Sequence, residues 1–348
     1  MNYKYLLAAI LISLVSVLSC SDSDKEEEVV AKITLNKTET TIEIGGTETL
    51  VATLSTSTTE PVVWTSSDEY VATVFHGIVT AITSGEVTIT ATVGSISASC
   101  VVTVPQKEYK LVWSDDFDGT ALNTEKWRYE TGGNGWGNQE LQYYTDRTDN
   151  VRLEDGYLII EAKKENQGNN KYTSGRIITK GKAQFTYGKM EARISLPSGN
   201  GTWPAFWMLG TRGGWPGCGE IDIMEHVGKE PTMISHALHT ANRNGMNGKN
   251  WNSKDYFQGV EGSFHTYGVE WIEKEDRGFD CIKFFVDGVE TATCFQGIDN
   301  RADWPFNNEF FLILNVAIGG SWGGTVDDSI FDKPVQMKVD WVKVYQLQ

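Results

Sequence analysis

Alternation of apolar and polar residues with a period of two runs through much of residues 106–348, and it restricts the fold more than any other feature. Side chains on a β-strand point to opposite faces in turn, so this period predicts strands. No long amphipathic helix is visible in the same stretch. About 240 residues of strand can form a single β-sandwich, and curved antiparallel sheets would supply a concave groove. The clearest strand segments are 157–162, 188–194, 282–286, 310–316 and 338–345.

One short stretch, residues 219–226, holds three carboxylates among large apolar side chains. On a strand, Glu220 and Asp222 share a face, and the isoleucines beside them take the other. Strict alternation would turn Glu225 towards the apolar side, which is costly for a charge. A β-bulge near residues 223–224 would bring Glu225 back beside the other acids, and bulges are common next to active sites. The stretch therefore predicts a bulged strand that carries three clustered acids.

Crowded carboxylates repel one another, so at least one of them should have a raised pKa. Hydrolysis of a glycosidic bond needs one ionised and one protonated carboxyl group. Alternating acids can equally be the solvated face of an ordinary strand, but the aromatic neighbours favour a sugar cleft, because sugar rings lie on aromatic rings. We expect Phe206 and Met208 to be core residues and the tryptophans to divide between core and cleft. The neighbours are Trp203, Trp207, Trp215, His236 and His239.

The composition favours a β-rich protein that acts on a neutral glycan. The chain holds 12 Trp, 13 Tyr, 14 Phe and 35 Gly but only 8 Pro, which suits many strands joined by tight turns. Its formal net charge of −16 argues against nucleic-acid binding, which needs basic patches. The same charge disfavours a sulfated or uronic-acid glycan through long-range repulsion. We therefore expect a neutral polysaccharide or glycan as substrate.

The N-terminus predicts export and lipid attachment. Residues 1–19 combine Lys4 with an apolar run too short to span a bilayer, as in a signal peptide. The segment then reads Val-Leu-Ser-Cys and resembles a bacterial lipoprotein signal, which implies that Cys20 becomes the lipidated first residue. Ordinary secretion with an incidental cysteine is the alternative.

The acidic tether at residues 20–30 is similar to the export tag of Bacteroidetes-type surface lipoproteins, although a plain solvated spacer has the same composition. Together with Cys20, it leads us to expect an outer-membrane lipoprotein at the surface of a Gram-negative cell. We expect the protein to be a monomer that is held to the membrane by this lipid.

Residues 31–104 contain short strands rich in Thr and Val, separated by glycines, which suggests a small β-sandwich. The run from Trp64 to Thr90 resembles the bacterial Ig-like domain of group 2. This resemblance implies a spacer or adhesive module, and the segment shows no candidate site. Pro105 marks the boundary with a second domain, residues 105–348.

Two cysteines are placed to form a disulfide. Asp287 and Gly288 are a two-residue hairpin signal, and Cys281 and Cys294 lie six residues to either side of it. Counting outward makes the cysteines a directly opposed, non-hydrogen-bonded pair, where side chains come closest. A disulfide there would contribute about 3 kcal/mol in the entropic model, and two buried thiols are the alternative. No metal-type cysteine spacing occurs.

Residues 109–347 resemble glycoside hydrolase family 16, most closely its laminarinase-like β-glucanases. This resemblance implies a concanavalin-like β-jelly roll of two curved sheets. The whole chain is then all-β, with an N-terminal Ig-like β-sandwich before the jelly-roll catalytic domain. The matching motifs are 113–119 (WSDDFDG), 138–145 (NQELQYYT), 173–177 (TSGRI), 187–193 (YGKMEAR), 203–210 (WPAFWMLG), 220–225 (EIDIME), 265–271 (HTYGVEW) and 315–320 (NVAIGG).

The resemblance implies catalytic roles for the three acids. Glu220 matches the nucleophile that attacks the anomeric carbon, and Asp222 matches a helper that holds the proton balance. Glu225 matches the general acid that protonates the leaving oxygen and later activates water. The implied mechanism is retaining, with carboxyl groups about 5–5.5 Å apart and no cofactor for catalysis. The family's sugar subsites are matched by Asn138, Arg176, Trp203, Trp207 and His239, and Trp215 and Trp322 are further candidates; Arg176 could instead form a structural ion pair.

Many family members also bind one structural calcium on the convex side, away from the cleft. The matching positions are a backbone oxygen near Asp116, the backbone of Gly156, and Asp340. Hard oxygen ligands suit calcium. The resemblance therefore implies a structural calcium and no catalytic metal.

Two departures from the family bear on the substrate. Members often read Gly-Gly-x-Trp-Pro-Gly where residues 319–324 read Gly-Gly-Ser-Trp-Gly-Gly, and the polar segment 241–260, expected as a loop beside the cleft, is unlike the family's. We predict an endo-acting glucanase for β-1,3 or mixed β-1,3/1,4 glucan. The alternatives are an endo-β-galactosidase on poly-N-acetyllactosamine or mucin O-glycans, an inactive surface glycan-binding protein, and an adhesin. The intact acids argue against a binder.

Overall fold

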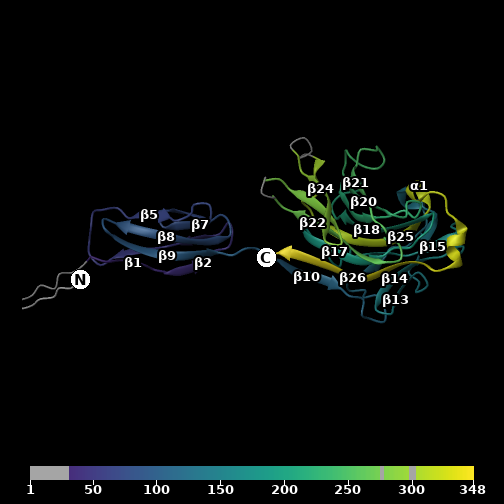
Figure 1. Cartoon of the computed structure of the whole chain (residues 1–348), viewed down its shortest axis with the longest axis horizontal. Coiled ribbons are helices and arrows are strands. Elements are labelled where there is room, and N and C mark those ends of the chain that lie inside the picture. The colour runs from purple at the N-terminus through teal and green to yellow at the C-terminus, as the bar shows by residue number, and fades with distance from the viewer. Residues whose placement is uncertain (1–30, 275–277, 298–302) are drawn as a thin grey trace, which may run out of the picture. The chain divides into compact units, whose positions relative to one another are not determined.

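The computed structural model describes residues 31–274, 278–297 and 303–348. The chain forms two compact units that divide between Gln106 and Lys107. Both units consist mainly of β-strands (Figure 1), so the predicted all-β fold is confirmed. The predicted lipidation site, Cys20, lies outside the described residues. Within those described ranges, no helix is long and apolar enough to cross a bilayer.

The smaller unit is a β-sandwich in which two sheets, β2-β9-β8-β5 and β3-β7-β6, share one core. Alternate residues of the long strands, such as Ile89 and Val102, point into that core and meet Val79 of the other sheet. The strands are β1 Ile33–Leu35, β2 Glu39–Thr41, β3 Thr47–Thr49, β4 Ala52–Leu54, β5 Val63–Ser66, β6 Ala72–Phe75, β7 Ile78–Ala81, β8 Gly85–Val93 and β9 Ile96–Val104.

The larger unit is built from two large sheets. The first has the order β13-β14-β26-β17-β22-β23-β24, with β10 also paired to β26; the second has the order β11-β16-β25-β18-β19-β20-β21. The first sheet and its neighbours comprise β10 Tyr109–Asp115, β13 Val151–Glu154, β14 Tyr157–Ala162, β17 Gly188–Ser195, β22 Phe264–Ile272, β23 Cys281–Val286, β24 Val289–Phe295 and β26 Val335–Leu347.

The second sheet comprises β11 Arg128–Tyr129, β16 Arg176–Ile178, β18 Thr202–Gly210, β19 Glu220–Glu225, β20 Met233–His239, β21 Trp251–Tyr256 and β25 Phe310–Ile318. A small parallel pair, β12 Gln142–Tyr144 and β15 Tyr172–Ser174, lies beside it. The short helical segments are η1 Gly135–Gly137, α1 Gly320–Gly323 and η3 Asp328–Asp332.

The long strand β26 shows how the sequence pattern produces the curved sheets. Alternate residues up to Val339 are buried, and from Val342 the alternation resumes in the opposite phase. The pairing with β17 skips one residue at this point, so Asp340 is a bulge. Such a bulge bends a strand and increases its twist. The polar–apolar phase change therefore marks the place where the strand bends.

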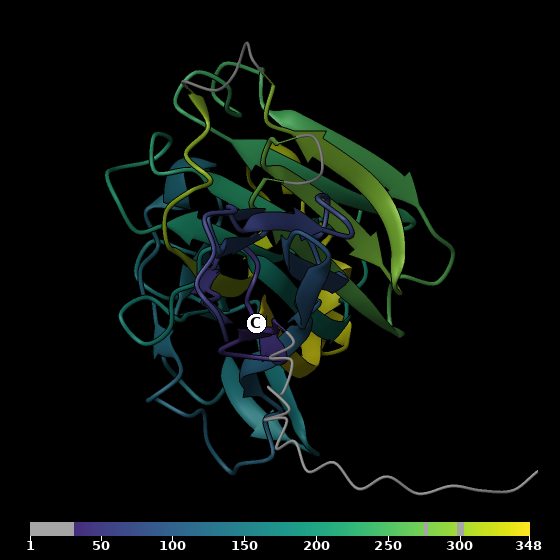
Figure 2. The same cartoon turned by 90° about the vertical axis from the view of Figure 1, so that its left-hand side faces the viewer.

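The two large sheets of this unit pack face to face through one apolar core. Phe206 and Met208 of β18 are fully buried in it, as predicted, with Trp271 and Phe284 from the other sheet. The strands drawn in green, β20 to β24, gather on one side of the unit in both views (Figures 1 and 2). Because one face of the sheet that holds β18 to β21 packs on this core, its other face is available to form the cleft described below.

The predicted disulfide is wrong. In the β23–β24 hairpin, Cys281 pairs with Phe295 and Ile282 pairs with Cys294, because the register shifts by one residue between Phe284 and Phe285. A one-residue shift turns every side chain beyond it to the other face. The two cysteines therefore point to opposite faces of the sheet, and no disulfide joins them in the described residues.

Candidate active site

A one-residue bulge in β19 places the three acids. Across β18, Trp207 pairs with Asp222 and Ala205 with Glu225; across β20, the partners of these acids are Ala237 and Ser235. Both neighbours have one residue between these pairs where β19 has two. The extra residue returns Glu225 to the face of the other acids, as predicted.

The chain just before β19 is fixed by a glycine. Gly219 has φ +83, a region that L side chains rarely adopt. A Cβ at this position would lie 2.7 Å from Cγ of Pro305 and 2.8 Å from Cζ of Phe310. Only glycine can occupy this position without moving the core, so the start of β19 is set by packing as well as by pairing.

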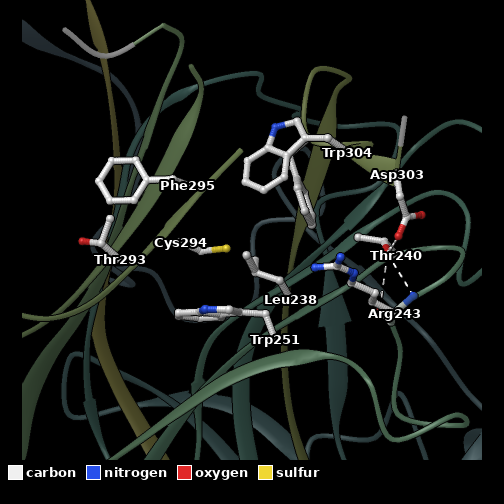
Figure 3. Close-up of a pocket in the computed structure, with 10 residues that line it drawn as sticks. Leu238, Thr240, Arg243, Trp251, Thr293, Cys294, Phe295, Asp303 and Trp304 are labelled. Carbon is white, nitrogen blue, oxygen red and sulfur yellow. Dashed lines mark hydrogen bonds between the residues drawn. The ribbon is translucent and has the colours of Figure 1, made fainter. Parts of the chain in front are cut away.

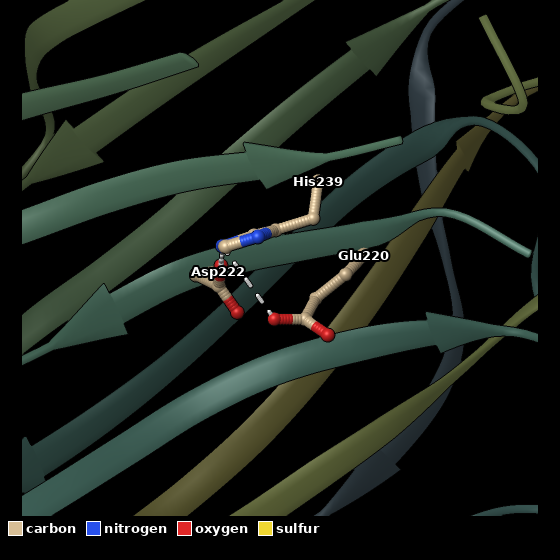
Figure 4. A group of neighbouring side chains, drawn as sticks. All are labelled: Glu220, Asp222 and His239. Atoms are coloured by element: carbon tan, nitrogen blue, oxygen red, sulfur yellow. Dashed lines mark ion pairs between the residues drawn. The ribbon is translucent and has the colours of Figure 1, made fainter. Parts of the chain in front are cut away.

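His239 is oriented towards the acids by the backbone. The N–H of Gly245 donates to its Nδ1 at 3.0 Å, so the neutral ring carries its proton on Nε2. That Nε2 lies 3.2 Å from Oδ2 of Asp222 and 3.7 Å from Oε1 of Glu220 (Figure 4). Nε2 therefore faces both carboxylates at ion-pair distance, although Oδ2 of Asp222 has no hydrogen-bond partner among the described residues.

Two tryptophans hold the outer acids. Nε1 of Trp215 donates to Oε2 of Glu220 at 2.7 Å, and Nε1 of Trp203 donates to Oε1 of Glu225 at 3.0 Å. A hydrogen bond to a carboxylate favours its ionised form and fixes its orientation. Each of the two acids therefore has its own indole partner.

Burial dominates the protonation of the acids. It raises the pKa of Glu220 to about 8, with a further contribution from the negative charge of Asp222. Burial also raises the pKa of Asp222, and burial together with the charge of Asp222 raises the pKa of Glu225 well above its usual range. Glu220 keeps 15% of its side chain exposed, so water offsets part of its burial. Three acids this close cannot all be ionised at neutral pH.

Opposing interactions separate Glu220 from Glu225. His239, the indole of Trp215 and the charge of Arg176 all lower the pKa of Glu220. His239 and the indole of Trp203 also lower the pKa of Glu225, but Glu225 lacks the Arg176 contribution and its pKa is raised by both other acids, whereas that of Glu220 is raised by Asp222 alone. The arrangement therefore favours a proton on Glu225 while Glu220 is the more easily ionised of the two, which is the pairing that glycoside hydrolysis needs.

The acids line a cleft of about 770 Å³ on the open face of the second sheet. All the side chains predicted at sugar subsites line it: Asn138, Arg176, Trp203, Trp207, Trp215, His239 and Trp322. Trp215 is 43% exposed, whereas Trp203 is 9% exposed and packs edge-on against Trp322 at 5.4 Å. The predicted division of the tryptophans between core and cleft is thus partial, because Trp203 belongs to both.

One wall of the cleft is a stack of rings around a guanidinium. The Arg176 guanidinium lies 4.7 Å from the Trp136 ring centroid and 4.8 Å from that of Trp207. Nε of Arg176 also donates to Glu130 at 2.7 Å. Arg176 is therefore both a cleft residue and a member of an ion pair, and the two interpretations of the sequence are compatible.

A buried polar network lies below this wall, and the sequence patterns did not predict it. Glu140 is 8% exposed and accepts hydrogen bonds from Asn138, Gln142 and Tyr144. Asn315 donates to the Tyr144 hydroxyl and accepts from Nε1 of Trp207 at 2.7 Å. A signal was available, since Asn315 is the one polar residue in the otherwise apolar strand β25.

The opposite wall corrects another expectation. The segment 241–260 was expected to be a loop, but residues 251–256 form β21, the edge strand of the sheet. Asn252 and Lys254 of this strand line the cleft, together with Asn250. The polar composition of the segment reflects an edge strand with one face on the cleft.

A second, smaller cavity of about 240 Å³ lies near the ends of β20 and β24 (Figure 3). Its lining includes Leu238, Trp251, Cys294 and Trp304, and none of the three acids. Leu238 precedes His239 on the strand, so the two side chains point to opposite faces. The carboxylate chemistry is therefore confined to the larger cleft.

Of the predicted calcium ligands, the Asp340 carboxylate is engaged with a cation of the protein, and the side chain of Asp116, where a backbone oxygen was the predicted ligand, lies near another. Oδ2 of Asp340 accepts from Arg193 at 2.5 Å, and Oδ1 of Asp116 lies 3.6 Å from Nζ of Lys343. Gly156 lies in the turn between β13 and β14 with φ +78. The backbone oxygens at Asp116 and Gly156 are not tested by these side-chain contacts, so the calcium site stays a prediction, and no catalytic step depends on it.

Glu220, Asp222 and His239 also bring potential metal-ligand atoms within 4.8 Å of one another. A histidine nitrogen binds a metal through a free lone pair, however, and Nε2 of His239 carries the ring proton in this tautomer. The cluster is therefore better described as a proton-sharing group than as a metal centre.

Comparison with known proteins places the larger unit. The family model described as "Beta-porphyranase A-D, GH16 domain" matches residues 109–347, and the model "Bacterial Ig-like domain (group 2)" matches residues 29–104. A β-glucanase from Rhodothermus marinus is 46% identical over 251 residues, which cover 68% of this chain and 85% of that protein.

Solved structures agree with these matches. The laminarinase from Rhodothermus marinus has a TM-score of 0.64 at 42% identity, over 70% of this chain and 99% of that one. The laminarinase from Flavobacterium sp. UMI-01 has a TM-score of 0.62 at 44% identity, over 68% and 100% of the two chains. These coverages are close to the share of the chain that the larger unit makes up.

Proposed function

This chain belongs to glycoside hydrolase family 16, and we propose that it is a retaining endo-β-glucanase that cleaves β-1,3 or mixed β-1,3/1,4 glucan. The observation that carries the chemistry is the β19 bulge, which brings Glu225 to the same face as Glu220 and Asp222. The choice of glucan as substrate is supported by the relatives, which are a β-glucanase and two laminarinases.

The first step would form a covalent glycosyl-enzyme. The Glu220 carboxylate attacks the anomeric carbon while the Glu225 carboxyl gives its proton to the glycosidic oxygen. The carbon–oxygen bond to the leaving sugar breaks, and that sugar departs with the proton from Glu225. Asp222, which raises the pKa of both outer acids, helps to keep the proton on Glu225 until it is needed.

The second step would reverse these roles. Glu225, now ionised, removes a proton from water, and the resulting hydroxide equivalent attacks the anomeric carbon. The ester bond to Glu220 breaks, and Glu220 returns to its carboxylate form with Trp215 and His239 as its partners. Two inversions at the same carbon give net retention of configuration.

The shape of the cleft supports cleavage inside a chain. Its lining runs from Arg176 on β16 to Lys254 on β21, across six neighbouring strands. At the usual strand spacing this is a width of about 24 Å, with Glu225 between the two ends. A polysaccharide can therefore contact the protein on both sides of the bond that is cut.

One variant and one stereochemical measurement test this function. Glu220→Gln should abolish turnover of laminarin while oligosaccharide binding is kept. Proton NMR of the first products should show the β anomer, because hydrolysis retains configuration. Substantial turnover by Glu220→Gln, or initial release of the α anomer, would exclude the double displacement.

A panel of laminarin, lichenan, agarose, keratan and mucin, with products read by mass spectrometry, tests the substrate. The glucans should be cut and the galactans left intact. Cleavage of keratan or mucin alone would replace the glucanase proposal by the endo-β-galactosidase alternative. Binding without cleavage of any of them would indicate an inactive glycan-binding protein.

We also propose that Cys20 carries a lipid that holds a monomeric enzyme at the outer membrane, exposed at the cell surface. The signal-like residues 1–19 and the acidic tether at 20–30 support this location. Metabolic labelling with a palmitate analogue should mark the natural protein but not Cys20→Ala, and protease treatment of intact cells should remove it. Labelling of the alanine variant would exclude Cys20 as the anchor.

A further inference from the structure

Two fully buried histidines lie behind the β19 bulge, one from each of two paired strands. His236 lies in the middle of β20, and its Nδ1 is 2.7 Å from the carbonyl oxygen of Ile223 in β19. His226 directly follows β19, and its Nδ1 is 2.7 Å from the carbonyl oxygen of Met233 in β20. A carbonyl oxygen only accepts, so both Nδ1 atoms donate. Each histidine thus reaches from its own strand to the backbone of the other.

The carbonyl that His236 binds belongs to the bulge itself. Ile223 has no partner in the register of β18 or of β20, although Asp222 on one side of it is paired with both strands. A buried carbonyl without a partner is destabilising, and a bulge leaves its extra residue outside the ladder. The imidazole of His236 therefore takes the place of the missing strand partner.

The far side of each ring is also held. Nε2 of His236 lies 2.9 Å from Oγ1 of Thr291, and the ring stacks on Phe284 with centroids 4.8 Å apart. Nε2 of His226 lies 3.0 Å from Oε1 of Glu261. Because both nitrogens of each ring have a partner, neither imidazole can rotate without losing a hydrogen bond.

We propose that His236 and His226 are positioning residues that clamp β19 to β20 on both sides of Glu225. Ile223 lies two residues before Glu225 and His226 one residue after it, so the two clamps fix the backbone that carries this acid. Neither histidine lines the cleft, so both act through Glu225 rather than on the sugar. This inference rests on the proposed role of Glu225 as the general acid.

The clamps matter because proton donation depends on position. A displacement of a reacting group by about 1 Å can lower the rate about 10²-fold. The nucleophile Glu220 lies on the other side of the bulge, where β19 pairs regularly with β18 and β20. Loss of a clamp should therefore impair the acid selectively.

A matched pair of variants separates the hydrogen bond from the ring. His236→Asn keeps a donor near the position of Nδ1 but loses the stack on Phe284, whereas His236→Phe keeps the ring and loses the donor. We expect kcat on laminarin to fall about 10²-fold in His236→Phe and about tenfold or less in His236→Asn. The melting temperature of His236→Phe should be equal to or higher than that of His236→Asn, because the phenyl ring keeps the stack on Phe284. If kcat follows melting temperature in both variants, the clamp is merely structural and the proposal is wrong.

An activated substrate supplies the second readout. A dinitrophenyl β-glucoside oligosaccharide has a leaving group that needs no proton, and azide can attack the glycosyl-enzyme without a general base. The loss in His236→Phe should therefore shrink several-fold on this substrate with azide present. An equal loss on laminarin and on the activated substrate would overturn the proposal.

Controls distinguish the failure of this inference from that of the proposed function. His265→Phe changes a histidine of the other sheet, which pairs with Asp287, and should leave kcat unchanged. If Glu225→Gln retains turnover, the proposed function itself fails. If Glu225→Gln is inactive while His236→Phe keeps its kcat, only the clamp fails. Should His236→Phe fold poorly, Thr291→Val removes the Nε2 partner instead and should show a smaller loss with the same dependence on the leaving group.

Discussion

The indole Nε1 of Trp203 donates to Oε1 of Glu225 over 3.0 Å, so a tryptophan that walls the cleft also sets the protonation of the acid beside it. This hydrogen bond lowers the pKa of Glu225 against the larger effect of burial. The tryptophan-rich motif at 203–207 is therefore part of the acid–base chemistry as well as of the sugar-binding surface.

Trp203→Phe should raise the pKa of Glu225 further, because the ionised carboxylate loses a donor. Glu225 must be protonated in the first step, so the alkaline limb of kcat/KM should move to higher pH by about one unit. Trp207→Phe is the matched control, since Trp207 donates to Asn315 and not to an acid. The pH profile of laminarin hydrolysis measures both, and a shift to lower pH would contradict the assignment.

Trp215→Phe should act on the other limb. Trp215 donates to Glu220, and this hydrogen bond lowers the pKa of Glu220. Without it Glu220 stays protonated to higher pH, so the acidic limb of the kcat/KM profile should move to higher pH by about half a pH unit. The shift is small because the indole is 43% exposed. Trp136→Phe loses a bond to the carbonyl of Gly132 but keeps an aromatic ring beside Arg176, and it should leave this limb in place because Trp136 donates to neither acid.

The buried acids should also make stability depend on pH. The folded-state pKa of Glu220 is raised from 4.5 to about 8 and that of Glu225 is raised well above its usual range, so the folded protein holds protons that the unfolded chain releases. This contribution is complete below about pH 4.5 and is lost as the pH rises through about 8.

Glu225→Gln removes one of these groups, so its advantage over the natural protein should be small at pH 5 and larger at pH 9. We expect a gain in melting temperature of about 3 °C or more at pH 9, measured by calorimetry. A variant that is less stable than the natural protein at pH 9 would show that the carboxylate is not strained there.

Deleting residues 31–104 should leave laminarin hydrolysis unchanged. The two units have separate cores, and all the cleft residues belong to the larger one. Specific activity on laminarin before and after deletion is the measurement, with whole-cell glycan binding as a companion. An adhesin would lose binding on this deletion, whereas an enzyme with a spacer domain would keep its turnover.

Local chemistry explains why much of the site was predictable. A strand cannot put Glu225 into the core without a large cost, and the sequence offers only one place, between Asp222 and Glu225, for the residue that corrects the alternation. The same reasoning applies to Phe206 and Met208, whose period of two predicted their burial. Features with a strong local penalty are visible in the residues themselves.

Contacts between distant segments were not predictable in the same way. Glu140 and Asn315 are 175 residues apart in the chain, and they meet through Tyr144 only because β25 lies beside the β12 segment. The strand β21 was mistaken for a loop because its polar face lies on the cleft and its edge pairs on one side only. Neither arrangement has a local signal strong enough to outweigh alternatives.

The β23–β24 hairpin shows the same limit in a testable form. Its turn was read correctly, but the bulge after Phe284 moves Cys294 out of line with Cys281, and nothing in the turn sequence reveals that bulge. We therefore expect both residues to be thiols in the purified protein. Burial also raises the pKa of Cys294 to about 12, so alkylation of this thiol in the native state should be slow.

Denaturation without reductant, followed by alkylation and peptide mass analysis, should add one alkyl group at Cys281 and one at Cys294. The same masses should follow treatment of the native protein with a thiol oxidant, because side chains on opposite faces of a sheet cannot meet without breaking the hairpin. Cys100 and Cys218, the other two cysteines of the described residues, act as internal standards for complete alkylation. A peptide pair lighter by two hydrogens would restore the disulfide and would require the two strands to pair one residue out of the register described here.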